Sequence, residues 1–220
     1  MKTDTAHEYW GREWARADGT SKWEHPEGEV MDFATRLPAG ARVLDLGAGV
    51  GRHALALARA GFDVAALDAS PEGIAEITRI ARAEGLNVQA TVGKMTDLPY
   101  PDASFDHVLS WNVIYHGDET VLATTIAEIA RVLKPGGTFL GTMLSARRIP
   151  VELAKFPGRE ISRNTWVFEV SGDDDKVHPH YFCDARDLVA LFHGFELCRL
   201  EDREHEKPGS WHWHLVMERL

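Results

Sequence analysis

A glycine-rich turn that follows a short apolar run constrains this fold more than any other feature of the sequence. Residues 43–46 (VLDL) predict a buried strand, residues 47–51 (GAGVG) a tight turn, and residues 51–60 a helix. Because glycine has no Cβ, the backbone can bend sharply here and approach a ligand closely. The first turn of the helix adds unpaired N–H groups and a partial positive charge. The motif therefore predicts a ligand site at the carboxyl end of a parallel strand.

Short apolar runs and helical periods alternate along most of the chain. A helix is predicted to begin at Pro71 with Ser70 as its N-cap, and another spans residues 118–133. Further strands are predicted at residues 64–67, 88–92, 105–111, 138–144, 195–200 and 211–217. Strands apolar enough to be buried on both faces predict an α/β fold, with helices on both sides of a parallel sheet. The last two strands are joined without a helix, which predicts an antiparallel pair at one edge.

Two segments differ from this alternation. Residues 1–40 combine aromatic and polar side chains and end in a loop signal, which indicates a change of pattern near residue 41. Residues 145–182 are predicted to be mostly irregular, apart from a strand at 165–170. A long connection inside a compact domain is usually functional, so we expect this insertion to cover a substrate.

Composition excludes several classes of partner. The chain has 24 Lys and Arg against 34 Asp and Glu, a formal net charge of −10, so it offers no basic field for a nucleic acid. It has no run of about 18–20 apolar residues for a membrane span, and residues 1–8 lack the apolar core of a secretion signal. With two distant cysteines, Cys183 and Cys198, a reducing cytoplasmic location is expected.

Two acidic residues flank the glycine turn and narrow the choice of ligand. Asp68 ends the second strand, where its carboxylate can accept hydrogen bonds from the two hydroxyls of a ribose. Asp45 lies two residues before Gly47, where it can order the turn and receive a cationic amino group. A nicotinamide dinucleotide is disfavoured, because Asp45 would repel its pyrophosphate and Arg52 stands where the third motif glycine is required.

Four blocks in order resemble the class I S-adenosylmethionine-dependent methyltransferases, in particular their small-molecule group (type 11 and 25-like). The blocks are VLDLGAGVG at 43–51, Asp68, LPYPDASFD at 98–106, and RVLKPGG at 131–137. The resemblance covers roughly residues 40–145. It implies a Rossmann-like three-layer sandwich with a mostly parallel seven-stranded sheet and an antiparallel edge strand. It also implies S-adenosylmethionine as cofactor and S-adenosylhomocysteine as product.

The same resemblance implies roles for individual positions. Asp45, Gly47 and Gly49 would hold the methionine end of the cofactor. Asp68 would bind the ribose hydroxyls, and Ala69 would lie under the adenine. Lys94 and Met95 would lie at the adenine edge, and Trp111 beside the sulfonium. Relatives often carry Gly-Asp after the third strand. Here Lys94 replaces that aspartate and cannot accept a hydrogen bond from the adenine amino group. The resemblance also implies an N-terminal helical cap at residues 1–40 before a methyltransferase domain at residues 41–220. It favours a lid formed by Trp10 and Trp14, over a helix merely packed on the core.

The reacting side of the site is expected beyond the carboxyl ends of the fourth and fifth strands. His116 is the best-placed candidate for a general base, with Tyr115 beside it. The other interpretation is that His116 begins the next loop and is only hydrogen-bonded. The pair His178 and His180, followed by Cys183, suggests a metal site, yet no paired ligand set is evident and no metal is predicted.

These observations predict a methyltransferase that acts on a small molecule by in-line displacement, as a monomer or homodimer. The alternative is a non-catalytic module that binds S-adenosylmethionine and acts through protein partners. The alternating histidines and tryptophans of residues 211–214 are explained by core packing and by solvation of an edge strand.

Overall fold

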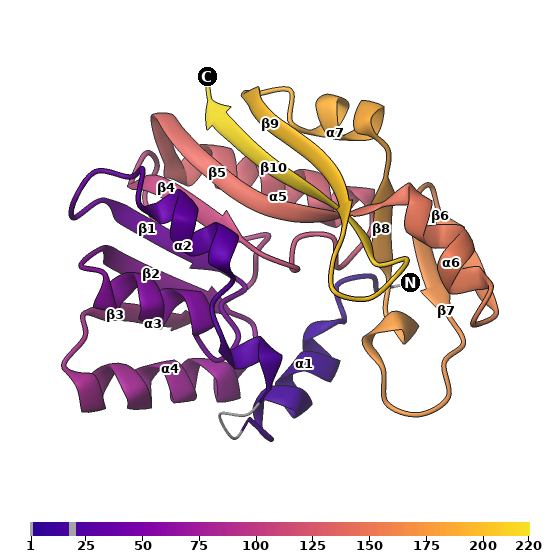
Figure 1. Ribbon diagram of the computed structural model, residues 1–220, viewed down its shortest axis with the longest axis horizontal. Coiled ribbons are helices and arrows are strands. Elements are labelled where there is room, and N and C mark those ends of the chain that lie inside the picture. Colours follow the sequence, from indigo (N-terminus) through magenta and orange to yellow (C-terminus); the bar gives the residue numbers. More distant parts are fainter. Residues whose placement is uncertain (1, 18–20) are drawn as a thin grey trace.

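A mixed sheet forms the centre of the computed structural model, which describes residues 2–17 and 21–220 (Figure 1). Its main part runs β3-β2-β1-β4-β5-β10-β9, and the first five strands of this order are parallel. The bounds are β1 (Arg42–Leu46), β2 (Asp63–Asp68), β3 (Val88–Val92), β4 (Phe105–Ser110), β5 (Leu133–Ser145), β9 (Phe195–Glu204) and β10 (Trp211–Arg219). The predicted α/β class is confirmed, and the antiparallel strand is β10, which lies between β5 and β9.

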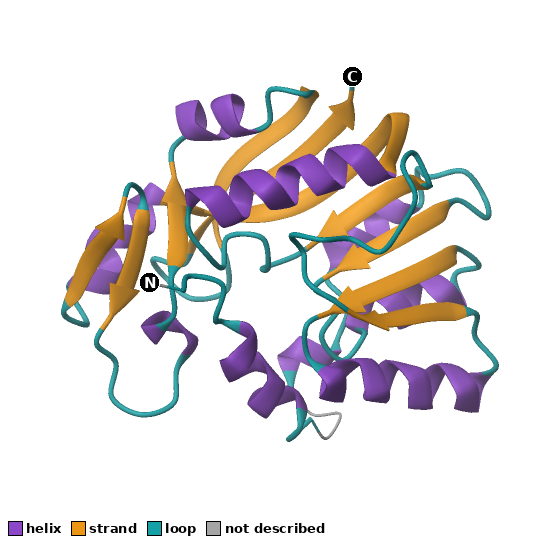
Figure 2. Cartoon of the chain, turned by 180° about the vertical axis from the view of Figure 1, so that it is seen from behind, coloured by secondary structure: helices purple, strands orange, loops and turns teal. Residues whose placement is uncertain are grey.

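Helices cover both faces of this sheet (Figure 2). They are α2 (Gly28–Ala34), α3 (Arg52–Arg59), α4 (Pro71–Glu84), α5 (Glu119–Val132) and α7 (Ala185–Leu191). In β1, Val43 packs in the apolar cluster with α2, α3 and α4, whereas its neighbour Leu44 packs in the cluster with α5 and α7. Successive residues of a strand point to opposite faces, so an apolar strand supplies two cores at once. The three-layer arrangement follows from that pattern.

The helix ends match the signals in the sequence. The Ser70 hydroxyl accepts a hydrogen bond from the Gly73 amide at 3.1 Å, and Pro71 occupies the first helical position of α4. Asp118 caps α5 in the same way, through the Val121 amide at 3.0 Å. Such caps satisfy amides that have no partner inside the helix, and therefore fix where each helix begins.

The insertion at residues 145–182 is more regular than predicted. It contains η2 (Ala146–Arg148), α6 (Ile149–Leu153), β6 (Gly158–Ser162), β7 (Thr165–Phe168), η3 (Asp175–Val177) and β8 (His180–Cys183). β6 and β7 form an antiparallel hairpin, and β8 pairs with both β7 and the last residues of β5. The prediction failed because β6 is largely exposed and carries little apolar signal. β8 takes the edge of β5 that is left free where β4 ends.

The N-terminal segment lies between the main sheet and the insertion (Figure 1). It contains α1 (His7–Trp14) and, after the gap, η1 (Lys22–Glu24). Residues 1 and 18–20 of the predicted cap lie outside the described residues. Among the described helices, none is long and apolar enough to cross a membrane.

His107 gives the fold a testable dependence on pH. Its ring is buried in β4, stacks on Phe33 at 5.0 Å between ring centroids, and lies 2.8 Å from the Thr138 hydroxyl. Burial lowers the pKa of His107 to about 4, so the folded chain keeps this ring neutral while the unfolded chain protonates it near its ordinary 6.5. The stabilisation is therefore complete above about pH 6.5 and is lost as the pH falls towards 4.

We expect His107→Phe to remove about 2–3 kcal/mol of the acid sensitivity of unfolding, at 1.36 kcal/mol for each pKa unit. The measurement is urea unfolding of both proteins at pH 7.5 and pH 4.5, comparing how far each free energy of unfolding falls. An equal fall in the two proteins contradicts the assignment.

Candidate cofactor and substrate site

Two cavities meet beyond the carboxyl ends of β1, β2 and β4. The first cavity is lined by the loops that follow these strands and β3, including Gly47, Gly49, Asp68, Ala69, Lys94, Met95, Trp111 and His116. The second has a volume of about 990 Å³ and lies between the insertion, α2 and the β9–β10 hairpin. Trp10, Trp23, Arg52, Trp111 and Asn112 line both cavities, so the two spaces share a wall.

The glycine turn after β1 has no room for a side chain at Gly47 or Gly49. Gly47 has a φ of +77°, and a Cβ there would lie 2.4 Å from the methyl groups of Val113. Gly49 has a φ of +55°, and a Cβ there would lie 2.9 Å from the Trp14 ring. Both positions combine a left-handed backbone with close contacts, which only glycine tolerates without strain. The bare backbone of this turn forms one wall of the first cavity.

Asp68 links the turn to the end of β2. Its Oδ2 accepts a hydrogen bond from the Gly49 amide at 2.7 Å, and its Oδ1 accepts one from the Ser70 amide at 2.8 Å. Burial raises the pKa of Asp68, and the amides of Ser70 and Gly49 oppose that rise. A carboxylate has about four acceptor sites, so two amides leave it with capacity for hydroxyl groups in the cavity.

Asp45 lies beneath the turn and does not line the first cavity. Its side chain is 2% exposed, and its Oδ2 accepts a hydrogen bond from the Ala54 amide at 2.9 Å, in the first turn of α3. Burial raises the pKa of Asp45 to about 7, against the effects of the Ala54 amide and Arg52. Asp45 therefore orders the turn and the helix start. Its contact with an amino group of the ligand stays a prediction.

The other predicted cofactor positions converge on the first cavity. Ala69 follows Asp68 along its edge, and Met95 lies on the loop after β3. Lys94 is engaged elsewhere, since its ammonium group donates to Asp4 at 2.9 Å and ties this loop to the N-terminal segment. Trp111 is buried at the shared wall, and its indole N–H has no hydrogen-bond partner among residues 2–17 and 21–220.

The N-terminal segment closes the first cavity. Trp10 stacks on Trp14 with ring centroids 5.1 Å apart, and both rings line the cavity. On the other side, the Arg12 guanidinium pairs with Asp173 of the insertion at 2.7 Å. α1 thus contacts the turn after β1 and the insertion at the same time, as a lid would. Whether it moves stays a prediction.

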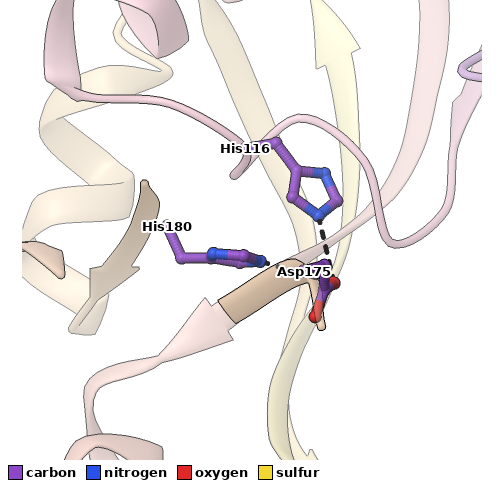
Figure 3. Close-up of side chains that lie close together, drawn as sticks. All are labelled: His116, Asp175 and His180. Atoms are coloured by element: carbon purple, nitrogen blue, oxygen red, sulfur yellow. Dashed lines mark ion pairs between the residues drawn. The ribbon is translucent and has the colours of Figure 1, made fainter. Parts of the chain in front are cut away.

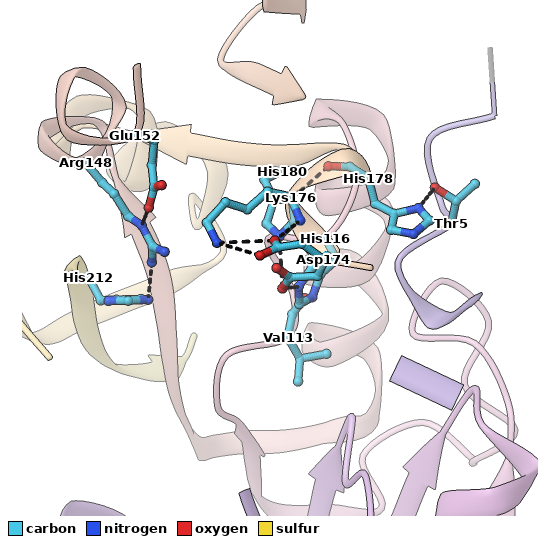
Figure 4. Close-up of polar contacts among 11 residues, drawn as sticks. Thr5, Val113, His116, Arg148, Glu152, Asp174, Lys176, His178, His180 and His212 are labelled. Atoms are coloured by element: carbon cyan, nitrogen blue, oxygen red, sulfur yellow. Dashed lines mark hydrogen bonds and ion pairs between the residues drawn. The ribbon is translucent and has the colours of Figure 1, made fainter. Parts of the chain in front are cut away.

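Polar side chains of both signs line the second cavity. Arg148 donates to Glu152 at 2.8 Å and lies 3.3 Å from Nε2 of His212 (Figure 4). Burial, with help from His205 and Arg148, lowers the pKa of His212 to about 2, so this ring is neutral. The explanation of residues 211–214 by edge-strand solvation is wrong. β9 covers β10, and His212 and His214 are buried and line the cavity.

Glu29 of α2 holds the cavity wall together. Its carboxylate accepts hydrogen bonds from Arg199 and Arg203 of β9, and lies 2.8 Å from Nδ1 of His214 in β10. Burial alone would raise the pKa of Glu29, but the His214 hydrogen bond and the two arginine charges lower it. No local pattern along the chain predicts this cluster, because Glu29 lies about 170 residues from the arginines that it binds.

His116 and Tyr115 occupy the boundary between the cavities. His116 lines the first cavity and Tyr115 the second, with ring centroids 4.7 Å apart. Burial raises the pKa of Tyr115, so its hydroxyl stays protonated, and burial lowers the pKa of His116. The predicted pair is therefore brought together at the expected end of the sheet.

Sequence reasoning missed Asp175, which faces His116 and His180 (Figure 3). Burial raises the pKa of Asp175, but the two histidines, in their protonated form, hold it well below its usual range. The only sequence signal was its place in the Gly172–Asp175 turn, which predicted a bend and nothing more. The side chains of His178 and Cys183, by contrast, lie outside this group. His178 lies 2.9 Å from the Thr5 hydroxyl, and the Cys183 thiol contacts the Leu144 carbonyl oxygen.

Comparison with known proteins agrees with this geometry. Residues 43–137 match the model of a methyltransferase domain family. The chain is 39% identical over 137 residues to a ubiquinone biosynthesis O-methyltransferase of Xanthomonas axonopodis pv. citri, a match that covers 59% of this chain and 56% of that protein. It is 41% identical over 104 residues to a glycine/sarcosine/dimethylglycine N-methyltransferase of Actinopolyspora halophila, covering 46% of this chain and 18% of the other. The chain thus spans about half, or less, of the length of these curated relatives.

Solved structures extend the likeness over the whole fold. A crystal structure of a Pyrococcus horikoshii OT3 protein matches with a TM-score of 0.74 and 24% identity, covering 94% of this chain and 99% of that one. The family match at residues 43–137 confirms the predicted resemblance to the class I S-adenosylmethionine-dependent methyltransferases, and the structural match confirms their Rossmann-like fold. The individual site residues stay predictions that the geometry supports.

Crowding at the glycine turn yields a matched pair of variants. Gly47→Ala and Gly40→Ala both place a Cβ on a left-handed backbone, but nothing lies within 4 Å of a Cβ at Gly40. We expect Gly40→Ala to lower the free energy of unfolding by about 1–2 kcal/mol and Gly47→Ala by about 1–3 kcal/mol more, because only the second forces Val113 to move. Urea unfolding at neutral pH measures the difference. Equal losses would show that the turn is not tightly packed.

Proposed function

We propose that this chain transfers a methyl group from S-adenosylmethionine to a small-molecule acceptor, and releases S-adenosylhomocysteine. One observation carries the proposal. The first cavity, which contains the glycine turn and Asp68, adjoins a second, larger polar cavity, and the two share lining residues. A transfer between two bound molecules needs two such adjoining spaces, so that the reacting atoms can be aligned.

The first cavity suits the proposed cofactor in shape and chemistry. The backbone at Gly47 and Gly49 lines this cavity without side chains, and Asp68 keeps acceptor capacity for the ribose hydroxyls. Indole rings, among them Trp10 and Trp111, offer π faces to a positively charged sulfur. S-adenosylmethionine supplies a methyl carbon already activated by that sulfur. The residues of this chain therefore need chiefly to bind, to orient and to exclude water.

The second cavity suits a polar acceptor. Its walls carry the paired charges of Arg148 with Glu152 and of Arg203 with Glu29, together with the neutral ring of His212. Tyr115 stays protonated and can donate a hydrogen bond, whereas the Nε2 atom of His116 can accept a proton or bind an ion. We propose that these two residues act on the acceptor at the shared wall.

Known relatives support a small acceptor. A Burkholderia thailandensis 1,6-didemethyltoxoflavin-N1-methyltransferase, solved with bound 1,6-didemethyltoxoflavin and S-adenosylhomocysteine, matches with a TM-score of 0.71 and 19% identity, covering 100% of this chain and 91% of that one. The net charge of −10 opposes a nucleic-acid substrate. A non-catalytic binding module needs no second cavity, so the volume of about 990 Å³ favours an enzyme. A cytoplasmic location and a monomeric or homodimeric state stay predictions.

Calorimetric titration with S-adenosylhomocysteine tests the cofactor. We expect S-adenosylhomocysteine to bind to the unaltered protein. NAD should not bind, since its binding would indicate a nicotinamide-dependent enzyme instead. Asp68→Ala should weaken binding by about 10- to 100-fold, because each charge-assisted hydrogen bond contributes about 1.5–3 kcal/mol. Asp63→Ala, at the exposed start of β2, is the matched control and should bind normally. Unchanged affinity in a folded Asp68→Ala protein contradicts the assignment.

A further inference from the structure

We propose that His116, Asp175 and His180 form a binding site for a divalent transition-metal ion (Figure 3). One atom of each, able to act as a ligand, lies within 4.8 Å of the others. The three residues come from the loop after β4, from η3 and from the start of β8. Two imidazoles and one carboxylate are a ligand set that zinc, iron, cobalt and nickel accept, whereas calcium and magnesium prefer oxygen alone.

Hydrogen bonds at the far side of each ring fix the tautomers. Nδ1 of His116 lies 2.8 Å from the Val113 carbonyl oxygen, and Nδ1 of His180 lies 2.8 Å from the His178 carbonyl oxygen (Figure 4). A carbonyl oxygen only accepts, so each Nδ1 carries the hydrogen and each neutral ring keeps its lone pair on Nε2. Histidines that bind metals are usually oriented by a hydrogen bond of this kind.

Three acceptor atoms consequently face one another across a gap. The distances from Oδ2 of Asp175 are 3.8 Å to Nε2 of His116 and 3.6 Å to Nε2 of His180, too long for hydrogen bonds. Atoms that share a tetrahedral metal ion at about 2.0–2.2 Å lie about 3.3–3.6 Å apart, close to these values. A cation in the gap would satisfy all three acceptors at once.

The Nε2 atom of His116 is a buried acceptor without a hydrogen-bond partner among the described residues. His116 is 8% exposed and His180 is 5% exposed. Buried polar atoms are nearly always paired, and an exception of this kind indicates a missing ion or water. The nearby positive charge of Lys176 is already engaged, since its ammonium group lies 3.3 Å from Asp174.

The position of the site indicates what the ion would do. His116 lines the first cavity, whereas Asp175 and His180 line the second. Three protein ligands leave at least one coordination position for a water or a substrate atom, as in catalytic rather than structural sites. The acceptor class is therefore a molecule with a hydroxyl or thiol that can bind the ion. Its proton passes to solvent, its lone pair forms the bond to the methyl carbon, and the methyl–sulfur bond breaks to release S-adenosylhomocysteine.

This acceptor role rests on the proposed function, but the binding of the ion does not. The proposal also replaces the sequence-based expectation of no metal, and makes His116 a ligand instead of a free base. The sequence analysis grouped His180 with His178 and Cys183 instead. His116 and Asp175 lie 59 positions apart, and only the fold brings them together.

Metal titration of the chelator-treated full chain tests the site. We expect one Zn²⁺ per chain by calorimetry, and visible absorption bands of Co²⁺ in the same site. Asp175→Asn, which keeps the shape of the side chain, and His180→Ala should each weaken Zn²⁺ binding at least tenfold. His178→Ala and Asp174→Asn are matched neighbours outside the cluster and should bind Zn²⁺ normally.

Two outcomes overturn the proposal: no Zn²⁺ binding by the unaltered chain, or equal binding by the folded Asp175→Asn protein. Thermal unfolding of each variant verifies that it is folded. Titration of the same samples with S-adenosylhomocysteine separates the two proposals. Cofactor binding without Zn²⁺ binding refutes only the metal site, whereas Zn²⁺ binding without cofactor binding refutes only the proposed function.

Discussion

The turn after β1 is held in place by a short set of amide hydrogen bonds, and the site depends on it. The Gly47 and Ala48 amides donate to the Leu67 carbonyl oxygen at 2.8 and 3.0 Å, and the Gly49 amide donates to Asp68. At Gly47 and Gly49 the turn requires a backbone without a side chain, because Val113 and Trp14 fill the space where a Cβ would lie. The same contacts join β1, β2, the loop after β4 and α1. One local conformation thus sets both the shape of the first cavity and the position of its cover.

The sequence predicted much of the fold because its signals there are local. The short apolar run of β1, the Ser70 cap of α4 and the glycine turn each act within a few residues. The end of the second predicted strand placed Asp68 at the first cavity, and the family resemblance placed Trp111 there. The insertion was predicted poorly, since its hairpin is largely exposed and is stabilised by pairing with β8 and, through it, with the end of β5.

The second cavity was not predictable from the sequence, because its walls come from segments far apart along the chain. Glu29 meets Arg203, and Arg148 meets His212, only after β10 has paired with β5. A buried charge must be paired, so each of these contacts also requires its partner to be in place. Distant groups of this kind leave no periodic pattern, in contrast to a strand or a helix cap. They became visible only in the folded chain.

The contacts of α1 with both halves of the molecule have a consequence for how ligands exchange. Trp10 lines both cavities, while Lys94 and Asp173 anchor the N-terminal segment, through Asp4 and Arg12, at opposite ends of its path. Both anchors are exposed ion pairs, which contribute little and weaken as salt concentration rises. Displacing this segment would expose the first and the second cavity together. Cofactor and acceptor would then enter and leave by the same opening, and higher ionic strength would favour that opening by weakening the two ion pairs.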